Sequence, residues 1–274
     1  MNATRRTVCA TSFGAVAQNL VARSCRDGAI GVVGDVVERF SSGCYVRFGD
    51  ELVAVGNVPR GPLHVVVDGA QRDLGSGRSV MLRAGGPPAT IAETAIANAL
   101  VIDLSRARLW APSPPRGDEL AALSASCSSL DVDALVASDL ADVWDSACAS
   151  IRAGDAQRAV EQLQGRGAGL TPTGDDVIAG LLLAGAWTRP DRIAEERRIE
   201  LAGAVRTTSL SLSFLRWAAV GQSIEPVHRL VVAAASRDPE RFAAATEAVA
   251  AIGGSSGRAL LAGLAAGLTD VLAF

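Results

Sequence analysis

The sequence predicts an α+β fold, in which a β-rich N-terminal domain precedes an all-α C-terminal domain. Between residues 29 and 68, short runs rich in Val, Phe and Tyr alternate with turn signals such as Gly-Asp and Pro-Arg-Gly-Pro. From residue 118 to the end, the apolar residues have helical spacing. Residues 111–117, Ala-Pro-Ser-Pro-Pro-Arg-Gly, form the clearest linker of the chain. We therefore expect domains at residues 1–115 and 116–274.

The N-terminal domain is predicted to begin with a helix, because residues 11–24 place apolar side chains at helical spacing. The runs that follow are short and close together, which favours a small antiparallel sheet or a small barrel. We expect strands at residues 30–33, 36–40, 44–48, 52–55, 63–67, 79–83, 100–104 and 107–110.

The C-terminal domain is predicted to be a helical bundle with a buried last helix. Aromatic residues make up only 4% of the chain, so Ala, Val, Leu and Gly must supply a closely packed core. We expect helices at residues 118–126, 131–152, 155–163, 194–204, 207–220, 224–236, 239–251 and 260–274, with a further helix after residue 171.

Composition excludes several functional classes. The 274 residues carry a net charge of -3 without a basic block, so we expect no nucleic-acid partner. Every basic residue is arginine or histidine, which excludes Schiff-base and phosphate-loop lysine chemistry. No apolar run reaches about 18 residues, and the N-terminal run is a poor signal peptide. We therefore expect no membrane association and a cytoplasmic location.

Few side chains are candidates for metal binding or acid–base chemistry. The five cysteines are widely spaced without a Cys-x-x-Cys pair, which argues against a disulfide framework and against a zinc site. His64 lies in a strand-like apolar run and is expected to be a core or edge residue with satisfied polar atoms, whereas His228 is expected on a helix surface. The remaining candidates are carboxylates, chiefly Asp175 and Asp176, with Glu93 as a further one.

The most informative stretch is Gly-Arg-Gly-Ala-Gly-Leu-Thr-Pro-Thr-Gly-Asp-Asp, at residues 165–176. Its glycines, Gly169 among them, indicate a loop, and the helix after it begins with Thr171 as N-cap or with Thr173 as N-cap and Asp176 closing a capping box. A helix N-terminus suits an anion, and paired carboxylates suit a divalent cation, an arginine or proton transfer. The plainer alternative is that Asp175 and its neighbour only stabilise the helix start.

Residues 252–264 repeat this pattern. Aligning Gly174 with Gly257 places Thr173 on Ser256 and gives both segments a hydroxyl-Gly start followed by Ala-Gly-Leu. We expect the two helices to pack together around an anion site. One wall would be formed by Thr171, Thr173, Gly174, Asp175 and Asp176, with Gly169 of the loop beside them, and the other by Ser255, Ser256 and Gly257. The alternative is that both loops are tight turns that allow close helix contact.

A third candidate segment begins at Arg206. Its guanidinium suits a carboxylate or phosphate, and Thr207, Thr208 and Ser211 gather at the same helix start. The alternative is a hydroxyl cap followed by an exposed polar face.

These motifs resemble the AllH-type family. Residues 165–181 carry the most specific similarity, and residues 99–112, 206–211 and 252–263 resemble further blocks of the family. The resemblance implies a link to anaerobic allantoin (purine) catabolism and to oxamate carbamoyltransferase, which converts oxalurate and phosphate to oxamate and carbamoyl phosphate. It also implies a small carboxylate or phosphate ligand, a CoA-ligase-like partner subunit and catalytic roles for Asp175 and Asp176, one of which would hold any divalent cation.

The chain departs from the family pattern at three places. Ala259 stands where the family carries Asp, Gly254 replaces a polar residue, and Ala168 replaces Pro. The leading interpretation is an AllH-like component of a carbamoyltransferase-type system. The alternative is a non-catalytic protein that binds or senses a small anion, or a divergent standalone paralogue, and the sequence leaves open whether the chain is an enzyme.

Overall fold

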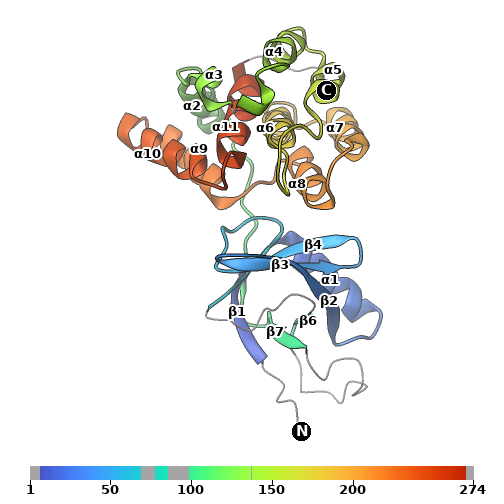
Figure 1. The fold of residues 1–274 in the computed structure, drawn as a ribbon. Coiled ribbons are helices and arrows are strands. Elements are labelled where there is room, and N and C mark those ends of the chain that lie inside the picture. The colour runs from blue at the N-terminus through green and yellow to red at the C-terminus, as the bar shows by residue number, and fades with distance from the viewer. Residues whose placement is uncertain (1–6, 69–77, 86–98, 137, 270–274) are drawn as a thin grey trace. The chain divides into compact units, whose positions relative to one another are not determined.

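The computed structural model describes residues 7–68, 78–85, 99–136 and 138–269 (Figure 1). Its internal contacts divide the chain into two compact units, Met1–Ala111 and Pro112–Phe274. The sequence places the division a few residues later, inside the same proline-rich segment. In the described residues, the first unit is a β-barrel with one helix and the second unit is entirely helical, which confirms the predicted α+β class.

The strands of the first unit close into a ring. Their order is β5-β4-β3-β2-β6-β7-β1-β8, and an additional pairing of β5 with β1 completes the circle of β1 to β7. The barrel is thus the correct one of the two predicted forms, but its sheet is mixed, because β1/β7, β4/β5 and β6/β7 pair in parallel. The strands are β1 (Thr7–Phe13), β2 (Gly31–Phe40), β3 (Gly43–Phe48), β4 (Glu51–Gly56), β5 (His64–Val67), β6 (Ser79–Arg83), β7 (Leu100–Asp103) and β8 (Arg108–Leu109).

A buried hydrogen bond lies where the barrel closes. His64 is buried on β5, and its Nε2 atom lies 2.8 Å from the hydroxyl of Ser12 on β1. The backbone N–H of Gly61 lies 2.9 Å from Nδ1 of the same ring. The expectation of a core histidine with satisfied polar atoms is therefore confirmed.

One prediction for the first unit is confirmed in part and another is wrong. The helix predicted at residues 11–24 is α1 (Ala15–Arg26), with Gly14 as N-cap, but residues 11–13 belong to strand β1. The Gly-Asp pair at residues 34–35 is not a turn but lies inside the continuous strand β2. A Cβ atom on Gly34 would lie 2.6 Å from Cδ1 of Phe48, so this glycine makes room for a ring from the next strand.

The described part of the helical unit contains the expected helices with one clear exception; residues 270–274 of the predicted last helix lie outside the described range. Asp131 does cap a helix, accepting from the N–H of Ala134 at 3.2 Å, but that helix ends at Leu135. The indole N–H of Trp144 then donates to Asp133 over 2.8 Å, which fixes a turn in place of the predicted helix at 131–152. The elements are α2 (Asp118–Cys127), α3 (Val132–Leu135), the 3-10 turn η2 (Ser138–Leu140), α4 (Trp144–Arg152), α5 (Ala156–Leu163), α6 (Thr173–Thr188), α7 (Arg192–Ala204), α8 (Ser209–Ala219), α9 (Glu225–Ala235), α10 (Pro239–Ala250) and α11 (Ser256–Thr269).

Helix α6 is the centre of this unit. Almost all of its residues are buried, and it packs against α11, α8, α7 and α5 (Figure 1). At its C-terminal end, the buried guanidinium of Arg198 donates to the carbonyl oxygens of Arg189 and Ala219, at 2.9 and 3.0 Å. These bonds satisfy carbonyl groups at the ends of α6 and α8, where the last carbonyl oxygens of a helix have no N–H donor within the helix.

Three further features bear on the functional classes. His228 is half-buried rather than on the surface, its ring centroid lies 6.0 Å from that of Trp187, and burial lowers its pKa to about 4. All five cysteines are free thiols, and burial raises the pKa of Cys44 to about 11 and that of Cys127 to about 12. Within the described ranges, no helix is both long and apolar enough to cross a membrane.

Candidate functional site

Helices α6 and α11 cross at very short distance through glycines. A Cβ atom on Gly180 would lie closer than 3.0 Å to the carbonyl oxygen of Leu260, and one on Gly263 would be equally close to that of Val177. The sequence alignment of the two motifs pairs Gly180 with Gly263 and Val177 with Leu260. Equivalent residues of the two motifs therefore make the same contact in both directions, as in a local two-fold arrangement. The predicted packing of the two helices is confirmed.

The first glycine of each motif has the same environment. A Cβ atom on Gly174 would collide with the carbonyl of Leu163 at the end of α5, and one on Gly257 would collide with that of Val249 in the last turn of α10. Each glycine lets the preceding helix end directly against the new helix start. These glycines thus have the packing role that the plainer interpretation assigned to them.

The two helix starts meet through hydroxyl groups. The hydroxyl of Thr171 lies 3.0 Å from that of Ser256, and the hydroxyl of Thr173 lies 3.1 Å from that of Ser255. Residues more than 80 positions apart therefore form one polar junction between α6 and α11, which we call the hydroxyl junction.

Both predicted caps of α6 are wrong. Pro172 occupies the N-cap position, and its carbonyl accepts from the N–H groups of Asp175 and Asp176 at 3.0 and 3.2 Å. The N–H of Gly174 donates to the carbonyl of Arg166 at 2.9 Å. Because the chain satisfies these first-turn donors itself, they are not available to a bound anion.

Asp175 joins three segments and is fully buried. Its Oδ1 accepts from the N–H of Gly165 at 2.7 Å, and its Oδ2 accepts from the hydroxyls of Thr207 and, at 2.8 Å, Ser211. Every donor is an N–H or O–H group that points at the carboxylate, so a metal ion has no free oxygen here. The carboxylate holds the glycine-rich loop and the start of α8 against α6.

Asp176 is placed differently. The residue is half-buried, and its Oδ2 is shielded from solvent without a hydrogen-bond partner among the residues that the structure describes. Burial raises the pKa of Asp176 to about 7, the hydroxyls of Ser256 and Thr171 beside the carboxyl lower it, and the neighbouring charge of Asp175 raises it. A carboxyl group that titrates near neutrality can both accept and release a proton under ordinary conditions.

The sequence motifs did not predict a third carboxylate that lies at the junction. Asp139, on the turn η2, accepts from the hydroxyl of Thr173 at 2.8 Å. Since that hydroxyl has one proton, Ser255 must donate to Thr173 in turn. A Cβ atom on Gly167 would lie 2.5 Å from the same Asp139 oxygen, which explains one glycine of the loop. No spacing rule identifies Asp139, because a chain reversal brings η2 to this place.

The remaining predicted residues lie around the junction or apart from it. Gly169 is exposed in the loop at φ 103°, a conformation that favours glycine. Thr208 caps α8, accepting from the N–H of Ser211 at 3.1 Å, and it donates to the carbonyl of Leu170 at 2.6 Å. The exposed Arg206 lines a separate small cavity between α5 and α7. Glu93 lies outside the described residues.

A divalent cation does not fit this arrangement. The described parts of the chain contain no group of three His, Cys, Asp or Glu side chains that could hold a metal ion. Both oxygens of Asp175 already accept from protein donors, and Oδ2 of Asp139 accepts from Thr173. Asp176 keeps a buried oxygen without a partner among the described residues, which suits hydrogen bonding and proton exchange.

Comparison with known families agrees with the motif. Residues 163–268 match the model of the family described as oxamate carbamoyltransferase subunit AllH. The match confirms the predicted AllH-type resemblance from the last residue of α5 into α11, and thus covers both motifs of the hydroxyl junction. Asp139 and the barrel unit lie outside the matched range. The comparison with solved structures found no match.

Proposed function

With residues 163–268 similar to an oxamate carbamoyltransferase subunit, we propose that the chain is the AllH-type component of a carbamoyltransferase and that the hydroxyl junction binds the carbamoyl or amide group of its substrate. The observation that carries this proposal is the buried, unpartnered Oδ2 of Asp176. A buried acceptor without a donor costs about 1–3 kcal/mol, so a ligand that supplies an N–H group gains this energy on binding.

The chemistry of the junction favours an amide over a bare anion. The –CONH2 group of oxamate, oxalurate or carbamoyl phosphate offers N–H donors to Asp176 and to the hydroxyl oxygens of Thr171 and Ser256, which lie 3.0 Å apart. A phosphate or carboxylate placed at the same point would be repelled by Asp176 and its neighbour Asp175. The charged end of such a substrate would therefore point away from the two carboxylates.

Asp176 also has the acidity that carbamoyl transfer requires. In the direction that forms oxamate, an oxygen of hydrogen phosphate bonds to the carbamoyl carbon of oxalurate, and the bond from that carbon to the bridging nitrogen breaks. The departing nitrogen takes the proton of the Asp176 carboxyl. Hydrogen phosphate loses its proton to water, and Asp176 regains one from water, so the protons balance. A pKa of about 7 gives both protonation states at neutral pH.

In this proposal the two adjacent carboxylates have separate roles. Asp176 is the catalytic residue that contacts the substrate, while Asp175 is a positioning residue that fixes the loop and α8. Thr171 and Ser256 orient the amide, and Asp139 orients Thr173. The CoA-ligase-like partner expected from the family resemblance would provide the rest of the enzyme, since the matched family is described as a subunit.

Ligand-induced stabilisation tests the proposal. Oxamate, oxalurate and carbamoyl phosphate, each at several millimolar, should raise the melting temperature of the full chain, whereas inorganic phosphate should have a smaller effect. The variant Asp176→Asn should lose the response without a lower melting temperature of its own. The matched control is Asp142→Asn, which removes an exposed carboxylate paired with Arg166 and should respond like the wild type. Equal responses of wild type and Asp176→Asn would disprove the assignment.

A further inference from the structure

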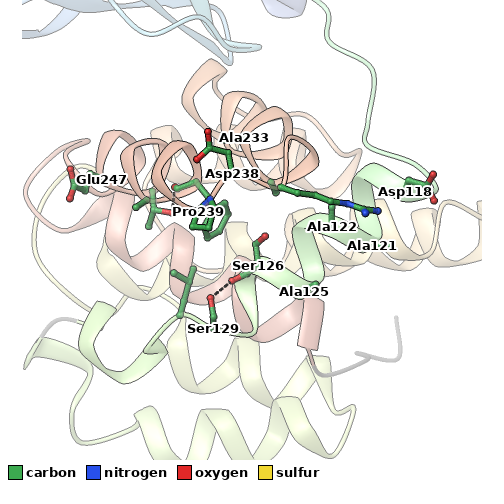
Figure 2. Close-up of a pocket in the computed structure, with 16 residues that line it drawn as sticks. Asp118, Ala121, Ala122, Ala125, Ser126, Ser129, Ala233, Asp238, Pro239 and Glu247 are labelled. Atoms are coloured by element: carbon green, nitrogen blue, oxygen red, sulfur yellow. Dashed lines mark hydrogen bonds between the residues drawn. The ribbon is translucent and has the colours of Figure 1, made fainter.

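The helical unit has another concave surface, which lies between α2, α9 and α10 (Figure 2). It has a volume of about 870 Å³ and is lined mainly by apolar atoms. None of its residues belongs to the hydroxyl junction or to either glycine-rich motif. We call it the alanine groove, because alanines supply much of its wall: Ala121, Ala122 and Ala125 on α2, Ala233 and Ala234 on α9, and Ala243 on α10.

The walls of the alanine groove restrict what can occupy it. All three are helices whose backbone N–H and C=O groups are bonded within the helix, so the groove offers no strand edge. An occupying peptide must therefore satisfy its own backbone, which a helix does. Short side chains such as those of Ala121 and Ala125, one helical turn apart and both exposed, let another helix approach closely.

The polar residues of the groove give it a negative character. The lining residues include Asp118, Asp238 and Glu247 and a single arginine, Arg237. Asp238 forms an ion pair with Arg241 at 3.2 Å, so Asp118 and Glu247 carry most of this negative character. Figure 2 shows Asp118 and Glu247 at opposite ends of the groove, with the alanines of α2 between Asp118 and the centre. Both end carboxylates are on exposed residues, and neither forms an ion pair with another described residue.

This charge pattern disfavours a second copy of the chain. Two such grooves packed face to face across a two-fold axis would bring Asp118 and Glu247 of one copy near the same carboxylates of the other. Like charges at an interface oppose association, whereas arginine or lysine at the ends of an incoming helix would be attracted.

From the shape, the alanine lining and the acidic ends, we propose that the alanine groove docks an amphipathic helix of a partner protein, with a continuous apolar stripe and basic residues at both ends of that stripe. The proposal is independent of the substrate assigned to the hydroxyl junction. It adds a specific protein-binding surface to a chain whose matched segment resembles a subunit.

Fluorescence anisotropy with two synthetic helices tests this surface on the full chain. One peptide of about 16 residues carries leucines on one face and arginines at both ends of the leucine stripe, and the other carries glutamates in place of the arginines. The wild type should bind the arginine peptide at least about tenfold more tightly than the glutamate peptide. The double variant Asp118→Arg/Glu247→Arg should reverse this preference.

The control variant is Glu119→Arg/Glu240→Arg, which changes carboxylates on the same two helices that do not line the groove. It should keep the wild-type preference. Binding of neither peptide, equal binding of both, or an unchanged preference in the groove variant would each overturn the proposal. Sedimentation that shows a dimer broken by Ala125→Arg would overturn it as well, because the groove would then serve a second copy of the chain.

Discussion

The starts of α6 and α11 are two versions of one structure with different chemistry. In both, a glycine lies against the end of the preceding helix, and a second glycine six residues later forms the crossing. The copies differ at the two positions directly after the first glycine, where α6 has Asp175 and Asp176 and α11 has Arg258 and Ala259. Glycines shared by both copies therefore report on packing. The proposed chemistry depends on the carboxylates that only one copy carries.

The largest loss of stability is expected from adding a side chain where α6 and α11 cross. Gly263→Ala places a Cβ atom against the Val177 carbonyl, in backbone that cannot move aside, and should destabilise the unit by about 3 kcal/mol or more. Gly203→Ala is the matched control, because Gly203 lies in α7 with open space around it. It should be neutral or stabilise by up to about 1 kcal/mol. Urea denaturation measures both, and similar values for the two would refute the packing role.

The next effect concerns Asp175. Asp175→Ala leaves the donors of Gly165, Thr207 and Ser211 without their acceptor, and should cost about 2–4 kcal/mol in unfolding free energy. Ser211→Ala should cost roughly 1–2 kcal/mol. Ser213→Ala should cost less, because that buried serine of the same helix bonds only the carbonyl of Ser209. A stable Asp175→Ala variant that has lost only ligand binding would show that Asp175 acts on the substrate directly.

Replacement of Asp176 should raise the unfolding free energy, whereas replacement of Asp175 lowers it. Its folded pKa of about 7 lies above the ordinary value, so its contribution to stability is fully present below about pH 4 and is lost as the pH rises through 7. Asp176→Asn removes the buried charge and should raise unfolding free energy at pH 8 by roughly 1–2 kcal/mol, with a smaller gain at pH 5.5. Thermal melts at both pH values measure the difference, and a loss of stability at pH 8 would contradict it.

The pH dependence of ligand binding gives a related test. Oxamate should bind the wild type more tightly as the pH rises through about 7, because the ionised Asp176 carboxylate is the better acceptor for its amide N–H. Calorimetric titration between pH 5.5 and 8.5 measures this affinity. Asp176→Asn should bind weakly at every pH, and a pH slope that persists in this variant would assign the titration to another group.

The smallest effect is expected from single hydroxyls of the junction. Ser256→Ala should cost about 0.5–1 kcal/mol in stability, and it should move the midpoint of the oxamate titration to higher pH, since that hydroxyl lowers the pKa of Asp176. Ser236→Ala, an exposed serine at the end of α9, is the control and should change neither quantity. An unchanged midpoint in Ser256→Ala would separate Ser256 from Asp176.

Local sequence patterns predicted those parts of the fold that depend on local spacing. The class, the barrel and most helices follow from periodicity and turn residues, and the repeated hydroxyl-Gly start followed by Ala-Gly-Leu predicted that α6 and α11 pack together. The caps of α6 were wrong because tertiary partners outcompete local ones: Thr173 bonds Asp139 and Ser255 instead of its own helix. Asp139 itself was missed because the predicted helix at 131–152 would have carried it elsewhere.

The distance along the chain between the two halves of the crossing has a consequence for synthesis. The hydroxyl pairs join residues 82 and 85 positions apart, which a ribosome adding about 5–20 residues per second separates by roughly 4 to 17 s. During that interval α6, whose native surroundings bury nearly all of its residues, has been made and its partner α11 has not. We expect the nascent helical unit to be a substrate for chaperones that bind exposed apolar segments, until the last helix completes it.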